Sequence, residues 1–206
     1  MASGSLPHLL LLLEHPHIYT LGKRGSLSDI LASPKELTRL GIEVHHSDRG
    51  GEVTYHGPGQ LVGYAIVNLR HWGGGALKYV RALEEALIST LSDFSISGTR
   101  EGKGAGVWIG NAKIAAIGVK VNRAVTMHGF ALNVNPDLSY FDLIVPCGVP
   151  NGSVTSMASE MSDPIEVSQV IPSLTRHFGE VFGYTMEQHN HVEWIDHPPF
   201  LRGLIL

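Results

Sequence analysis

A single cysteine stands at a turn that could present its sulfur to a substrate. Cys147 follows an apolar run and lies between Pro146 and Gly148. Pro146 lacks the N–H that a continuing central strand needs, and Gly148 frees the backbone just after the sulfur. A thiolate at this turn would be a nucleophile for covalent catalysis. The alternative is a small buried hydrophobe, which is a common role of free cysteine.

A reactive thiol needs a neighbouring cation or base, and Lys113 is the candidate activator. It begins the run Lys113–Val119, whose other members are small or apolar. Such neighbours desolvate an amine, which favours its neutral form and lets it pass protons. The alternative is a surface lysine whose stem lies along apolar neighbours while its ammonium reaches water. Spacing in the sequence does not bring Lys113 to Cys147.

The glycine-rich stretch Arg49–Gln60 admits three interpretations: a phosphate loop, a catalytic histidine or a binding site for an apolar group. A dinucleotide loop joins a strand to a helix, whereas Gly57-Pro58-Gly59 leads into the strand-like run 61–67. Pro58 also removes one of the N–H groups that a phosphate would need. Nucleotide binding by this loop is therefore disfavoured.

The histidines do not form a convincing metal motif. The chain has 12 of them, including the i, i+2 pairs His15/His17 and His189/His191. A structural zinc site needs closely spaced Cys and His pairs, which one cysteine does not supply. We therefore expect no metal site, and these pairs are interpreted as exposed or capping residues.

Length and charge limit the possible classes of protein. We expect 206 residues to form one catalytic domain, residues 1–206, with a sizeable core. A formal charge of −4 gives no general reason to expect nucleic-acid binding. The run Leu9–Leu13 is far shorter than the roughly 20 apolar residues that span a membrane, so no membrane association is expected. One cysteine excludes an internal disulfide, and no secretory signal is visible.

The elements that must position these residues are strands interleaved with helices. Apolar and β-branched runs predict strands at 8–14, 17–21, 42–46, 106–109, 113–121 and 125–134. Turns at Gly110-Asn111 and Asn122-Arg123 join the last three strands into a meander. The fold class expected is α/β (α+β), with a mixed, largely antiparallel sheet flanked by helices.

Three helices are predicted. Ser33-Pro34-Lys35-Glu36 supplies a cap, a first-turn proline and the glutamate of a capping box, and Gly41 ends this helix. Residues 76–91 carry apolar side chains at helical spacing. A third helix is expected from about 165 to 183, divided at Pro172 because proline lacks a helical N–H.

Taken together, these segments closely resemble the lipoyl/octanoyl transferase family over almost the whole chain. The matching motifs are Leu12-Leu13-Glu14-His15-Pro16, Tyr19-Thr20-Leu21-Gly22, Arg49–Gln60, Gly106-Val107-Trp108, Lys113–Gly118, His128–Asn133, Ile144–Gly148 and Val154-Thr155-Ser156. The departures lie at the ends: Met1–Pro7 stand where the family has a longer segment, and 187–206 is expected to be a variable tail.

The resemblance implies a fold like that of lipoate and biotin ligases. It also implies an enzyme that transfers an octanoyl or lipoyl group from acyl carrier protein to a lysine of a lipoyl domain, through an acyl-cysteine thioester. The nucleophile falls on Cys147 and the activating lysine on Lys113. The implied acyl-binding residues are Arg49, Gly50, Gly51, Glu52, Val53, Thr54, Tyr55, His56, Ala116, Ile117, Gly118, Gly129, Phe130 and Ala131. His56 and His128 are expected to orient substrate rather than to lead the chemistry.

The partners implied are acyl carrier protein and the lipoyl domains of 2-oxoacid dehydrogenase E2 subunits and glycine cleavage H protein. No cofactor is implied beyond the phosphopantetheine of the carrier. Such enzymes are cytoplasmic in bacteria and mitochondrial or plastid in eukaryotes. Lys78 and Arg81 on the helix 76–91 are one candidate docking face for an acidic carrier.

Two alternatives stay open. One is an ATP-dependent lipoate-protein ligase of the same fold, which the absence of a nucleotide-type glycine motif disfavours. The other is a carrier-binding protein with impaired catalysis.

Overall fold

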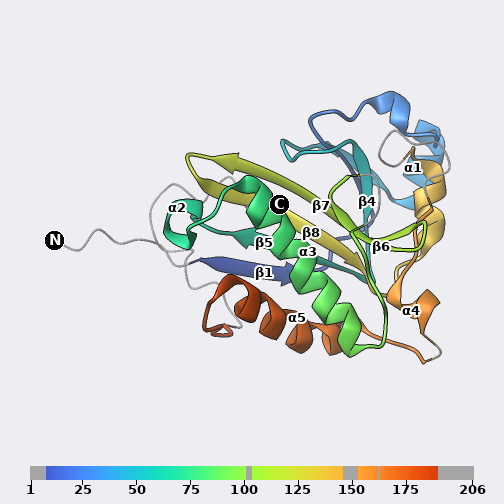
Figure 1. The fold of residues 1–206 in the computed structure, drawn as a ribbon. Helices are drawn as coiled ribbons and strands as arrows, with labels where there is room; N and C mark the ends of the chain where they lie inside the picture. The colour runs from blue at the N-terminus through green and yellow to red at the C-terminus, as the bar shows by residue number, and fades with distance from the viewer. Residues whose placement is uncertain (1–7, 101–103, 146–152, 162, 190–206) are drawn as a thin grey trace.

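The computed structural model describes residues 8–100, 104–145, 153–161 and 163–189, and its strands form two sheets (Figure 1). The larger sheet is antiparallel, in the order β1-β5-β8-β7-β6. Its strands are β1 (Leu9–Leu13), β5 (Gln60–Ile66), β8 (Val125–Asn133), β7 (Ala112–Asn122) and β6 (Gly106–Ile109). The predicted meander is thus confirmed.

The smaller sheet has three strands in the order β3-β2-β4. Its members are β2 (Ile18–Leu21), β3 (Glu43–His46) and β4 (Val53–His56). β2 pairs with β3 in parallel and with β4 antiparallel. The predicted mixed, largely antiparallel sheet flanked by helices is therefore confirmed, although it is divided into two sheets.

Helices α3 (Ala76–Asp93) and α5 (Val167–Phe182) lie side by side across one face of the larger sheet (Figure 1). Tyr79, Leu83, Leu87 and Leu91 recur every four residues on α3 and are fully buried against the sheet. The hydroxyl of Tyr79 donates to the carbonyl of Ala65 on β5 at 2.7 Å, which anchors the helix to the strand. Together these contacts form the main core.

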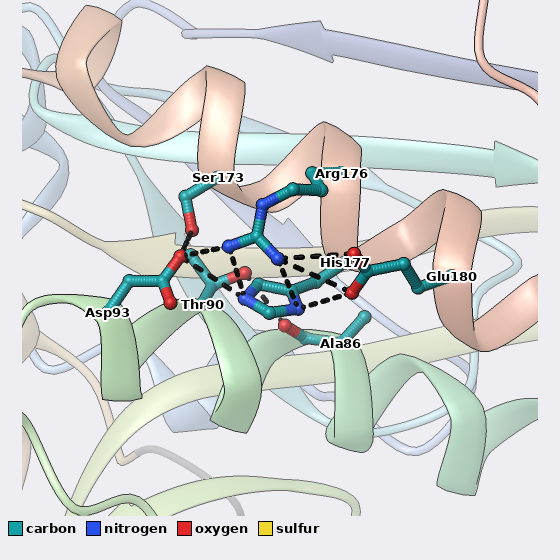
Figure 2. Close-up of polar contacts among 7 residues, drawn as sticks. All are labelled: Ala86, Thr90, Asp93, Ser173, Arg176, His177 and Glu180. Atoms are coloured by element: carbon teal, nitrogen blue, oxygen red, sulfur yellow. Dashed lines mark hydrogen bonds and ion pairs between the residues drawn. The ribbon is translucent and has the colours of Figure 1, made fainter.

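The outer edges of α3 and α5 are joined by polar side chains (Figure 2). His177 of α5 lies between two carboxylates, with Nε2 3.2 Å from Asp93 of α3 and Nδ1 3.1 Å from Glu180. Arg176 contacts the same two carboxylates, and Ser173 donates to Asp93. Because most of these side chains are exposed, each pair contributes little to stability on its own.

The prediction that Pro172 divides α5 is wrong, because the helix runs without a break from Val167 to Phe182. Pro172 and Ser168, one turn earlier, are both exposed. Water can therefore solvate the Ser168 carbonyl that proline leaves without its helical partner. The buried side chains of α5, among them Val170, Leu174 and Phe178, hold the helix together across this turn.

The smaller sheet has its own core. Tyr19, Leu21, Val53 and Tyr55 are buried there together with Phe141 from the 3₁₀ helix η2 (Leu138–Leu143). Helix α1 (Pro34–Leu40) begins as predicted, since the Ser33 hydroxyl accepts from the Glu36 N–H at 3.2 Å, and it ends at Gly41 in the left-handed conformation. Shorter elements are η1 (Leu27–Asp29), α2 (Leu69–Trp72) and α4 (Met157–Glu160).

Two classes of feature are missing from the part of the chain that the structure describes. None of its helices is long and apolar enough to cross a membrane. The described residues also contain no group of three or more His, Cys, Asp and Glu side chains that could hold a metal ion.

Candidate active site

A row of small residues lies on the face of the larger sheet that α3 and α5 leave uncovered. Gly118 of β7 pairs with Gly129 of β8, and Ala116 pairs with Ala131 two residues along. Because side chains alternate along a strand, the intervening Ile117 and Phe130 point to the helix side, where both pack in the main core. Four of the six predicted acyl-binding residues of β7 and β8 thus share one surface.

The loop before β4 lies directly over this surface. The N–H of Gly50 donates to the carbonyl of Val119 at 3.0 Å, which joins the loop to β7. A Cβ at Gly118 would lie 3.0 Å from the carbonyl oxygen of Gly50 and 3.2 Å from Cδ of Arg49. Only a residue without a side chain fits at this contact without a shift of its neighbours.

Arg49 holds the same loop against β2. Its Nη2 donates to the carbonyl of Thr20 at 2.7 Å and to the carbonyl of Glu52 at 2.9 Å. Its Nη1 donates to the carbonyl of Gly50 at 3.1 Å. Arg49 is predicted to bind substrate, and these bonds assign it at least a structural part, because its guanidinium donates to backbone carbonyls that shape the loop.

The predicted acyl-binding residues of β4 lie on two opposite faces of the strand, and one predicted residue of the preceding loop lies at the rim. Val53 and Tyr55 are buried in the smaller core, so their side chains pack behind the strand. Thr54 and His56 alternate with them and are only partly buried. Glu52 forms an ion pair with Arg24 at 3.1 Å at the rim.

The imidazole of His56 lies beside Gln60, His15 and Arg49. Its Nδ1 is 2.7 Å from Oε1 of Gln60, and its ring centroid is 5.8 Å from that of His15. Burial, reinforced by the charges of Arg49 and His15, lowers the pKa of His56 to about 4, although the bond to Gln60 opposes this change. His56 is therefore a neutral imidazole at physiological pH. His15 in turn contacts the Tyr64 hydroxyl at 2.6 Å, and burial lowers its pKa as well.

Lys113 is held by its backbone beside the segment that follows the cysteine in sequence. Its N–H donates to the carbonyl of Ser153 at 2.9 Å, and its carbonyl accepts from the N–H of Thr155 at 3.0 Å. Its Nζ lies 4.7 Å from the centroid of the Trp108 ring on β6, a cation–π distance. Cys147 itself lies outside the described residues, so its approach to Lys113 stays a prediction.

His128 is tied to the loop rather than to the small-residue surface. Its φ of 62° is a conformation that L-residues rarely adopt. Its Nε2 lies 2.7 Å from Asp48, which also pairs with Lys120. The hydrogen bonds from Lys120 and then His128 lower the pKa of Asp48 to about 2. This cluster fastens the loop to the β7–β8 hairpin.

The predicted docking pair lies elsewhere. Lys78 and Arg81 belong to α3, on the face of the larger sheet opposite Ala116 and Gly118. The Nζ of Lys78 lies 4.9 Å from the Trp72 ring centroid, and Arg81 pairs with Glu84 at 2.7 Å. A partner bound there would not contact the small-residue surface.

Sequence reasoning missed four polar residues of this region, His15, Gln60, Tyr64 and Asn133. Gln60 and Asn133 are buried side chains on paired strands, opposite one another in the register of β5 and β8. A polar side chain at a core position of a predicted strand was the available signal, because such groups need partners. Register supplies those partners, and it is visible only in the fold.

The family model described as the lipoyl protein ligase A/B catalytic domain matches residues 1–179. An octanoyltransferase of Solibacter usitatus is 52% identical over 183 residues, which is 89% of this chain and 82% of that protein. An octanoyltransferase of Flavobacterium psychrophilum is 46% identical over 186 residues, with 87% and 80% covered.

A solved structure of a lipoate-protein ligase A bound with ATP has the same fold. It superposes with a TM-score of 0.76 at 16% identity and covers 90% of this chain and 77% of its own. At that identity the likeness concerns the fold alone. The extent of the family match and the identity of the relatives go further: this chain belongs to the lipoyl protein ligase A/B catalytic domain family, as its motifs predict.

Proposed function

We propose that this protein is an octanoyltransferase that moves an octanoyl group from acyl carrier protein to the acceptor lysine of a lipoyl domain. The observation that carries this proposal is the 52% identity, over 89% of the chain, to a protein named octanoyltransferase. The row of small, uncharged residues Ala116, Gly118, Gly129 and Ala131 is consistent with it, since sites for apolar ligands are lined mainly by apolar groups.

In the first step the Cys147 thiolate attacks the carbonyl carbon of the octanoyl thioester. A new C–S bond forms and the C–S bond to the carrier breaks. The phosphopantetheine sulfur leaves as a thiol by taking a proton from the Lys113 ammonium, which leaves Lys113 neutral for the second step. The Lys113 ammonium would stabilise the attacking thiolate by its charge. The tetrahedral oxyanion needs N–H donors, for which the backbone near Cys147 or Gly118 is the proposed source.

In the second step the ε-amine of the acceptor lysine attacks the acyl-cysteine. The C–N bond forms, the C–S bond breaks and the cysteine leaves as a thiolate, while a proton of the amine passes to Lys113. Because the thioester is already activated and an amide is more stable, the sequence of steps needs no ATP. We propose E2 subunits and glycine cleavage H protein as acceptors, and the cytoplasm as the location if the source is bacterial.

The proposal is tested by mixing the full-length protein with octanoyl-acyl carrier protein and a lipoyl domain in the absence of ATP. We expect mass spectrometry to show one octanoyl group on the acceptor lysine. Transfer that requires ATP and free octanoate would assign the ligase reaction instead. Tight carrier binding without turnover would assign a binding protein, and either result would overturn the proposal.

The close contact at Gly118 gives a further prediction. Gly118→Ala is expected to lower kcat/KM for octanoyl transfer by about 10-fold or more, because the new methyl group displaces the loop at Gly50, and small misplacements near a reacting group are costly. The matched control is Gly75→Ala, where a Cβ meets no atom within 4 Å. Equal activity of the two variants would contradict the close contact. Thermal melting of both variants checks that they are folded.

A further inference from the structure

A line of side chains connects His56 to the segment that holds Lys113. Nδ1 of His56 lies 2.7 Å from Oε1 of Gln60, and Nε2 of Gln60 lies 2.9 Å from Oδ1 of Asn133. Nδ2 of Asn133 then lies 2.9 Å from the carbonyl oxygen of Thr155. Gln60 and Asn133 are 2% and 5% exposed, so water does not compete freely for these bonds.

The Thr155 carbonyl at the end of this line determines which group donates and which accepts in every hydrogen bond of the line. The Thr155 carbonyl can only accept, so Asn133 must present its NH₂ there and its oxygen to Gln60. Gln60 must then donate through Nε2, which also donates to the carbonyl of Tyr55 at 3.2 Å. Its oxygen therefore faces His56, and only a protonated Nδ1 can complete the bond.

The line thus selects one tautomer of His56. With its proton on Nδ1, a neutral imidazole carries a lone pair on Nε2. Within the part of the chain that the structure describes, no hydrogen bond to this Nε2 is found. Arg49 and the titratable His15 face the ring, and both oppose a second proton on it.

The far end of the line reaches the proposed activating lysine. Thr155, whose carbonyl accepts from Asn133, also donates its N–H to the carbonyl of Lys113. The same segment accepts from the Lys113 N–H through Ser153. His56 and Lys113 are therefore both fixed relative to one short stretch of backbone.

We propose that Gln60 and Asn133 are positioning residues that hold His56 as the neutral Nδ1–H tautomer, with Nε2 as the hydrogen-bond acceptor for the incoming lysine amine. The inference rests on the proposed function and assigns His56 to its second step. Nε2 orients the amine by accepting a hydrogen bond from the N–H that the amide keeps, while the single proton that is released passes to Lys113. Transfer of the acyl group to the cysteine does not use Nε2.

The first test needs no variant and no acyl transfer. In the full-length protein labelled with ¹⁵N-histidine, NMR is expected to show His56 as the Nδ1–H tautomer, unchanged from about pH 8 to about pH 5.5. The His56→Gln spectrum identifies the signal. An Nε2–H tautomer, a mixture of tautomers, or protonation near the ordinary histidine value of about 6.5 would overturn the proposal.

Gln60→Glu tests the role in the reaction. A carboxylate accepts from His56 but has no donor for Asn133, and its charge favours the imidazolium. The pKa of His56 should rise, so Nε2 becomes protonated as the pH falls. We expect aminolysis of the preformed octanoyl-enzyme to be about 10-fold or more slower than wild type at about pH 6.5 and to recover at about pH 8.5, whereas enzyme acylation should not show this pH-dependent loss.

The matched control is Gln188→Glu, which makes the same change at an exposed position. An equal loss in both half-reactions, independent of pH, would show a merely structural role for Gln60 and overturn the proposal. If Gln60→Glu does not fold, the tautomer measurement on the wild-type protein still decides. Failure of the proposed function is recognised separately, because it leaves no octanoyl-enzyme to aminolyse.

Discussion

Cys147→Ala is expected to abolish both the octanoyl adduct on the protein and transfer to the lipoyl domain. Alanine has no nucleophilic atom in its side chain, so the acyl-enzyme intermediate cannot form. Intact-protein mass spectrometry after mixing with octanoyl-acyl carrier protein measures the adduct directly, and the acceptor lysine reports transfer.

Two comparisons sharpen this experiment. Because Cys147 is the only cysteine in the sequence, alkylation of the wild-type protein should reproduce the loss seen in Cys147→Ala. His56→Ala should keep a measurable adduct, since His56 is assigned to the second step. An octanoyl increment that persists on Cys147→Ala, or none on the wild-type protein, would contradict the thioester mechanism.

The elements of the fold were largely predictable because their signals are local. Helix α1 begins after Ser33 and ends at Gly41, and both caps involve only a few neighbouring residues. The turn at Gly110 and Asn111 joins β6 to β7, as a short turn between two apolar runs predicts. Pro172 misled the prediction because its effect depends on whether the freed carbonyl is solvated, which is a property of the packed helix.

The site depends on relationships that local patterns do not contain. Alternation predicts that Ala116 and Gly118 share a face, but register is needed to bring Ala131 and Gly129 opposite them. The residue type of Arg49 predicts ligand binding, whereas the three backbone carbonyls to which its guanidinium donates are visible only in the fold. The hydrogen-bonded line from His56 to Thr155 joins residues up to 99 positions apart in the sequence, so only the fold reveals it.

Lys113→Met is expected to slow acylation of the enzyme by about 10²- to 10⁴-fold near neutral pH, the range typical for loss of a proton-transfer group. Methionine keeps an unbranched side chain against Trp108 but lacks the Lys113 ammonium, whose Nζ lies 4.7 Å from the centroid of the Trp108 ring. Without that cation the thiolate is less favoured, so a larger share of Cys147 stays protonated. The rate of Cys147 alkylation as a function of pH measures this share, and its profile should shift to higher pH in Lys113→Met.

A second substitution separates the two roles of the lysine. Lys113→Arg keeps a positive charge that is effectively permanent, so it should restore much of the alkylation profile but not aminolysis, because a guanidinium does not accept the amine proton. Lys35→Met is the matched control, since Lys35 is exposed on α1. An unchanged alkylation profile in Lys113→Met would show that the ammonium does not stabilise the thiolate. Aminolysis by Lys113→Arg at the wild-type rate would show that Lys113 does not accept the amine proton.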